Sequence, residues 1–88
     1  MLKKLETFKK KLIYRASYRG TKEMDKLLGS FTKKYINTFN EQELNQLSNL
    51  LDYDDENLYK YNQGIVTTIT FDLNRVTQLF KNYVYINE

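Results

Sequence analysis

Two short stretches of this sequence carry side chains that could do chemistry. Asp54-Asp55-Glu56 places three carboxylates in a row, a residue type that acid–base catalysts use in pairs. YRGTKEMD, residues 18–25, sets an arginine four residues before a glutamate. The 88 residues include neither histidine nor cysteine, so the commonest general base at neutral pH and the usual zinc ligands are absent. The chemistry open to this chain is therefore narrow.

The carboxylate run is better explained by structure than by catalysis. Its acids stand at an apparent helix start, where they cap free backbone N–H groups and meet the positive end of the helix dipole. The three glycines, at 20, 29 and 64, are too far apart to form a phosphate-binding loop. We therefore predict a protein that is not an enzyme, with no catalytic residue, no metal ligand and no cofactor bound stably by the chain itself.

Charge is distributed unevenly along the chain, whose net charge is +3. Residues 1–34 hold 11 Lys/Arg and 3 Asp/Glu, net +8, and residues 35–88 are net −5. The basic half could dock on an acidic or phosphate-bearing surface, although solvated helix faces explain any single lysine better. No apolar run approaches the roughly 18 residues of a membrane span, so no direct membrane insertion is expected.

Apolar residues recur at helical spacing in five segments. Helices are predicted at about 2–17 and 21–36, then from the Asn40 cap to Leu51, from Asp54 to Gly64 with Tyr59 and Tyr61 on its buried side, and from Leu73 to Tyr83. The 64–70 segment is predicted to be extended and unpaired. The predicted core comprises Leu27, Leu28, Phe31, Leu47, Leu51, Leu58, Val76 and Phe80. These patterns indicate an all-α protein, a small five-helix bundle forming a single domain over residues 1–88.

The YRGTKEMD stretch separates the first two predicted helices. Gly20 suits a backbone position with positive φ, and Glu23 and Asp25 suit the first turn of the second helix. Local structure does not explain Arg19. We therefore expect Arg19 and Glu23 to form an exposed polar pair that recognises a partner, and we expect replacement of either by alanine to leave the melting temperature nearly unchanged.

Arg19, Gly20, Glu23 and Asp25 resemble the RGxxE signature of the succinate dehydrogenase flavinylation factors, usually found as RRGMxELD. Tyr18, Thr21 and Met24 depart from that pattern. A second family stretch, LLxxxDPDLYxWL, is matched by Leu50, Leu51, Asp55, Leu58 and Tyr59, with departures at Glu56, Asn57, Tyr61 and Asn62. The resemblance extends from about Ile13 to Tyr83.

The resemblance implies an assembly factor, or chaperone, that binds the flavoprotein subunit of succinate dehydrogenase, and of the related fumarate reductase, and promotes covalent attachment of FAD. FAD would belong to that partner. Arg19, Gly20 and Glu23 would form the docking site, with Asp25 in support. We expect the factor to be a monomer when free and, from its Lys-, Asn-, Ile- and Tyr-rich composition and short N-terminus, to be bacterial and cytoplasmic.

A basic helical module that binds nucleic acid, or an antitoxin-like protein, is the alternative. A basic, tyrosine-rich domain could contact phosphates and stack bases. The prominent aromatic residues, however, fall on helical core stripes, and no recognition-helix pattern is present. Binding to a flavoprotein, rather than to nucleic acid, is therefore the prediction.

Overall fold

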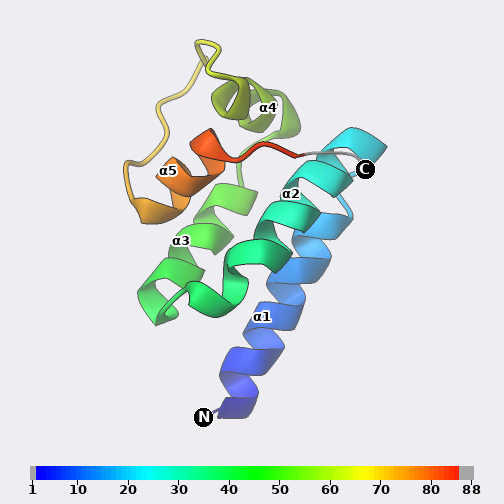
Figure 1. The fold of residues 1–88 in the computed structure, drawn as a ribbon, viewed down its shortest axis with the longest axis vertical. Helices are drawn as coiled ribbons and strands as arrows, with labels where there is room; N and C mark the ends of the chain where they lie inside the picture. The colour runs from blue at the N-terminus through cyan, green and yellow to red at the C-terminus, as the bar shows by residue number, and fades with distance from the viewer. Residues whose placement is uncertain (1, 86–88) are drawn as a thin grey trace.

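A computed structural model describes residues 2–85, which fold into five α-helices and one short 3-10 turn (Figure 1). The helices are α1 (Leu2–Ser17), α2 (Lys22–Tyr35), α3 (Glu41–Leu51), α4 (Asp55–Gln63) and α5 (Arg75–Asn82), and the turn η1 is Ile36–Thr38. Residues 2–85 contain no β-strand, so the prediction of an all-α, five-helix fold is confirmed. None of these helices combines the length and apolar character needed to cross a membrane.

The helices α1 and α2 form an antiparallel hairpin along one side of the molecule (Figure 1). Leu12 and Ala16 of α1 are fully buried, as are Leu28 and Phe31 of α2. Between the helices Thr21 adopts extended backbone angles and its side chain accepts a hydrogen bond from the N–H of Met24. This N-cap fixes where α2 begins, one residue after the predicted start.

Polar caps also define both ends of the segment that contains α3 and α4. Asn40 and Glu43 form a reciprocal capping box at the start of α3, as the sequence predicts. Asp54 caps α4 through the N–H of Asn57, and Gly64 ends α4 with φ +75°. The Asn40, Glu43 and Asp54 side chains satisfy N–H groups at the helix starts, whereas Gly64 ends α4 through its left-handed backbone.

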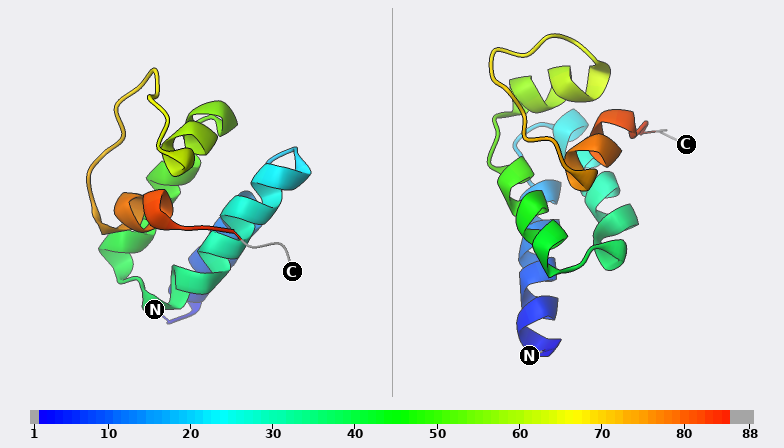
Figure 2. Two further views of the ribbon diagram at one scale, coloured as in Figure 1. Left: turned by 45° about the horizontal axis from the view of Figure 1, so that its top comes forward. Right: turned by 90° about the vertical axis from the view of Figure 1, so that its left-hand side faces the viewer.

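The connection from α4 to α5 is long and extended, and within residues 2–85 it pairs with no strand (Figure 2). It is held instead by Asn57, whose side-chain oxygen accepts hydrogen bonds from the N–H and the hydroxyl of Thr68. Asn74 and Thr77 form a second capping box that starts α5. Leu73 therefore precedes α5 and is 82% exposed, so the predicted start of this helix at Leu73 is wrong.

All eight predicted core residues are buried. The core also contains an aromatic cluster in which the rings of Phe31 and Phe80 lie 5.2 Å apart, edge to face, and those of Tyr61 and Phe71 lie 4.1 Å apart, stacked. Tyr59, predicted on the buried side of its helix, is 48% exposed. Asn57 occupies the buried side instead, because its amide bonds to both Asp54 and Thr68.

Candidate protein-docking site

Arg19 turns inward from the junction between α1 and α2. Its Nε lies 2.8 Å from Oδ1 of Asp55, the first residue of α4. Its two terminal nitrogens donate to the backbone carbonyls of Leu51, at 2.6 Å, and Tyr53, at 2.8 Å. The Arg19 side chain is only 12% exposed, and that of Asp55 is 32% exposed.

These bonds make Arg19 the link between the two helix junctions. Leu51 is the last residue of α3, where carbonyls lack helical partners and the dipole favours a cation. One guanidinium therefore closes the end of α3, pairs with the start of α4 and ties both to the α1–α2 junction. The predicted exposed Arg19–Glu23 pair is wrong: Arg19 pairs with Asp55, and Glu23 takes part in no ion pair within residues 2–85.

Asp25 supports the same junction from inside the first turn of α2. Its Oδ1 accepts from the backbone N–H of Arg19 and, at 3.2 Å, from that of Gly20. Gly20 has φ +118°, which confirms the predicted positive φ, and a Cβ built there would meet nothing within 4 Å. Within the described fold the glycine is thus needed for its backbone conformation and not to make room for a neighbour, because side chains disfavour this region whatever space surrounds them.

Gly20 and Glu23 form the outward side of the junction, since both are exposed. Tyr18, immediately before Arg19, is 68% exposed, and its ring lies 4.6 Å from that of Tyr14, which is 66% exposed. Two large exposed aromatic side chains beside a rigid turn are typical of a surface that binds another protein. The four predicted site residues are therefore brought together, with Arg19 and Asp25 facing inward and Gly20 and Glu23 facing solvent.

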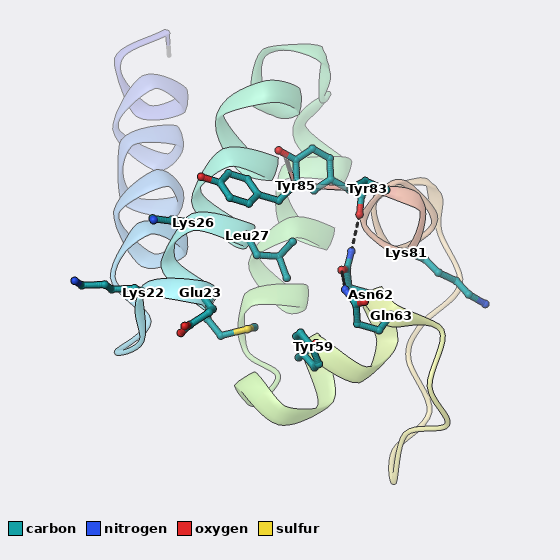
Figure 3. A pocket seen from close by; sticks show the side chains of 12 residues that line it. Lys22, Glu23, Lys26, Leu27, Tyr59, Asn62, Gln63, Lys81, Tyr83 and Tyr85 are labelled. Atoms are coloured by element: carbon teal, nitrogen blue, oxygen red, sulfur yellow. Dashed lines mark hydrogen bonds between the residues drawn. The ribbon is translucent and has the colours of Figure 1, made fainter. Parts of the chain in front are cut away.

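Glu23 also lines a groove of about 630 Å³ (Figure 3). We call it the α2–α4 groove. Its lining comes from α2, from α4, from the end of α5 and from the residues that follow α5. The lining residues are Lys22, Glu23, Met24, Lys26, Leu27, Tyr59, Asn62, Gln63, Lys81, Tyr83, Val84 and Tyr85. Asn62 holds one wall in place by donating to the carbonyls of Phe80 and Tyr83, each at 2.8 Å.

Two carboxylates away from the junction have lowered pKa values. The pKa of Glu43 lies below its ordinary value because the backbone N–H of Asn40 donates to it, with a further contribution from the Arg75 side chain. The pKa of Asp54 is lowered chiefly by a hydrogen bond from the Asn57 side chain. Hydrogen bonds formed at the helix starts thus contribute to both shifts, which agrees with the interpretation of Asp54 as a cap.

Sequence reasoning missed Asp55 as the partner of Arg19. The two residues are 36 positions apart, and a carboxylate at the start of a helix has a sufficient local explanation. The signal that could have found the pair is the match of both residues to family stretches. Asn62 gave no signal at all, because its role depends on the path of the segment beyond α5.

A rigid, partly exposed charged turn beside a groove is a geometry that protein-binding modules use. Comparison with known proteins identifies the family to which the chain belongs. The family model described as flavinator of succinate dehydrogenase matches residues 10–84, and the chain belongs to that family. The match covers the whole α1–α2 junction, the α3–α4 junction and the α2–α4 groove up to Val84.

Curated relatives agree with this result. The chain is 44% identical over 55 residues to succinate dehydrogenase assembly factor 2, mitochondrial, of Scheffersomyces stipitis, a match covering 62% of this chain and 37% of that protein. The protein of that name from Debaryomyces hansenii is 32% identical over 82% of this chain and 47% of its own length. Succinate dehydrogenase assembly factor 2-A, mitochondrial, of Drosophila willistoni is 32% identical, over 91% of this chain and 52% of its own length. The chain thus spans about half, or less, of these relatives.

The comparisons support some predictions and overturn one. The family and its relatives are assembly factors, which confirms the prediction of a non-enzymatic protein. The prediction of a bacterial, cytoplasmic protein is wrong, because these relatives are mitochondrial proteins of eukaryotes. Its basis was the Lys-, Asn-, Ile- and Tyr-rich composition and the short N-terminus, and neither feature identifies a compartment. No solved structure matches the chain.

Proposed function

We propose that this chain binds the flavoprotein subunit of succinate dehydrogenase and promotes covalent attachment of FAD to it. The observation that carries the proposal is the family match over residues 10–84, which includes the whole RGxxE turn. The geometry of that turn adds support, because Gly20 and Glu23 are exposed on a backbone that Arg19 and Asp25 hold in place. A docking site gains affinity when its contacts are ordered before binding.

The proposed mechanism is conformational rather than chemical. The chain has no histidine, so it supplies no imidazole for acid–base chemistry and no histidine to which FAD could be joined. It would bind the flavoprotein in the conformation where the flavin and its acceptor side chain meet, raising the population of that state. FAD belongs to the partner in this proposal, and the factor acts as a free monomer that forms a one-to-one complex.

Two further points of the proposal concern the client and the compartment. Fumarate reductase has a related flavoprotein and is proposed as a second client. Mitochondria are the proposed compartment, because the similar curated proteins carry that location in their names.

Reconstitution tests the proposal directly. Purified apo-flavoprotein of succinate dehydrogenase is incubated with FAD, with and without this chain, and covalent flavin is measured by its fluorescence in a denaturing gel. We expect at least a several-fold gain in rate or yield with the chain present. Equal covalent flavin in both reactions would overturn the proposal.

A matched variant shows whether the outward side of the junction is responsible. Glu23→Gln keeps the side chain's shape and removes its charge, and Glu6→Gln makes the same change at another exposed glutamate, in α1. We expect the first variant to lose most of the stimulation and the second to retain it. Equal activity of the two variants would remove Glu23 from the docking site.

A further inference from the structure

The α2–α4 groove carries charged side chains that form no ion pair within residues 2–85, as a binding site would. Lys22, Lys26 and Lys81 lie along its edges, with one acid, Glu23, at the α2 end (Figure 3). All four residues are exposed, and within residues 2–85 none of them forms an ion pair. The groove therefore presents net positive edges, and no ion pair within residues 2–85 neutralises their lysines.

Apolar and aromatic side chains lie between the charged edges of the groove. Met24 and Leu27, each less than 10% exposed, contribute to it from α2. Tyr59 lies opposite on α4 and is 48% exposed, and Val84, beyond α5, is 74% exposed. Tyrosine is enriched where proteins bind proteins, and Tyr59 is the exposed tyrosine on the α4 side of this groove.

A small polar ligand fits this groove poorly because its amides already have partners. The nitrogen of Asn62 donates to two backbone carbonyls, and the nitrogen of Gln63 donates to Oδ1 of Asn62. Small-ligand sites rely on a few polar groups that converge on the ligand. Here the amides of Asn62 and Gln63 bond to groups of the groove itself. The aromatic rings and the lysines at the edges therefore remain to contact a bound molecule.

We propose that the α2–α4 groove binds an acidic segment of the flavoprotein partner. Carboxylates of that segment meet the three lysines, and its apolar side chains lie on Met24, Leu27 and Tyr59. A basic or hydrogen-bond-donating group of the same segment faces Glu23. This inference rests on the proposed function and deepens it, because it extends the docking surface from the junction along α2 to α4.

Binding of the purified flavoprotein subunit, followed by calorimetry at two salt concentrations, tests the inference. The groove variant carries Lys22→Glu, Lys26→Glu and Lys81→Glu together. The control carries Lys3→Glu, Lys4→Glu and Lys10→Glu, the same change of charge on exposed lysines of α1, a helix that contributes no residue to the groove. We expect the groove variant to bind about 30-fold more weakly than the parent and the control to bind within about 3-fold.

Each outcome supports or overturns a distinct statement. If the parent does not bind the flavoprotein, the proposed function fails, and this inference fails with it. If the parent binds and the groove variant binds equally well, or loses no more than the control, the groove is not the site while the proposed function stands. Melting temperatures of both variants verify that they are folded.

Cross-linking identifies the segment that occupies the groove. Tyr59→p-benzoylphenylalanine places a photoreactive group in the groove, and the same change at Val66, which is 89% exposed in the α4–α5 connection, is the control. Mass spectrometry of the irradiated complex should find an Asp- and Glu-rich flavoprotein peptide attached at 59 and not at 66. A basic or neutral peptide at 59, or none, would overturn the assignment.

Discussion

The two sides of the α1–α2 junction differ in what their charges do. On the inward side, the Arg19 side chain is 12% exposed, and all three guanidinium nitrogens donate to groups near the α3–α4 junction. On the outward side, Glu23 is exposed and has no ion-pair partner within residues 2–85. Four residues of one short signature thus divide into a pair that builds the fold and a pair left free to contact a partner. A sequence motif need not have a single role.

Removing Arg19 should have the largest effect on stability. Arg19→Ala leaves the Asp55 carboxylate and the carbonyls of Leu51 and Tyr53 without this partner, at a cost of about 3 kcal/mol in the free energy of unfolding. Urea unfolding followed by circular dichroism measures that cost. Arg15→Ala is the matched control, because Arg15 is 37% exposed and its partner Asp52 68% exposed, and it should cost less than about 1 kcal/mol. Equal costs would contradict the inward role of Arg19.

Asp25 should come second. Asp25→Ala removes the acceptor for the N–H groups of Arg19 and Gly20, at a cost of about 1 to 2 kcal/mol. Asp25→Asn keeps a side-chain oxygen at the same place and should recover part of the loss. The same unfolding measurement applies, and a fully stable Asp25→Ala protein would show that the junction holds its shape without this carboxylate.

Gly20 is expected to serve both folding and binding, and Gly64 provides a control for the effect on folding. Both have positive φ, +118° and +75°, with open space where a Cβ would be. Gly20→Ala and Gly64→Ala should each cost about 1 kcal/mol of stability. Only Gly20→Ala should also weaken binding to the flavoprotein, because only Gly20 adjoins Glu23. Equal binding by the two variants would place the contact elsewhere.

Acid should destabilise the protein through its helix caps. Because hydrogen bonds lower the pKa of Glu43 and Asp54 in the folded state, their contribution is complete above the ordinary carboxylate pKa, about 4, and is lost as pH falls through the lower folded values. Thermal melts should therefore show a falling melting temperature below about pH 5. Glu43→Gln should be less stable than the parent at pH 7, with the difference shrinking toward pH 3. A constant difference across that range would exclude the carboxylate charge as the cause.

Local signals in the sequence predicted most of the fold. The caps at Asn40 and Asp54 and the glycines at 20 and 64 act within four residues of their own position, so their structural effects can be derived from spacing. The start of α5 was placed too early because Leu73 continues the apolar pattern, whereas the Asn74–Thr77 capping box fixes the first turn. The capping box therefore determines where α5 begins, and the apolar spacing of Leu73 does not.

The site was predicted less completely, and the reason is distance along the chain. The sequence singled out the candidate docking residues as a group, but Arg19 was assigned to its neighbour Glu23 when its partners lie 32 to 36 positions away. Which carbonyls and carboxylates an arginine reaches depends on how two helix junctions meet in space. Similarly, the buried face of α4 depends on Thr68 bonding to Asn57, a contact that no helical spacing contains.

The central claim is that Glu23 serves binding while Arg19 serves folding, and one paired measurement on Glu23→Gln tests it most directly. The melting temperature and the calorimetric affinity for the succinate dehydrogenase flavoprotein are measured on the same sample. The account predicts a melting temperature within about 1 °C of the parent, because an exposed side chain with no ion pair contributes little to stability, and an affinity at least 10-fold weaker. A protein that melts as the parent does and binds the flavoprotein equally tightly would contradict it.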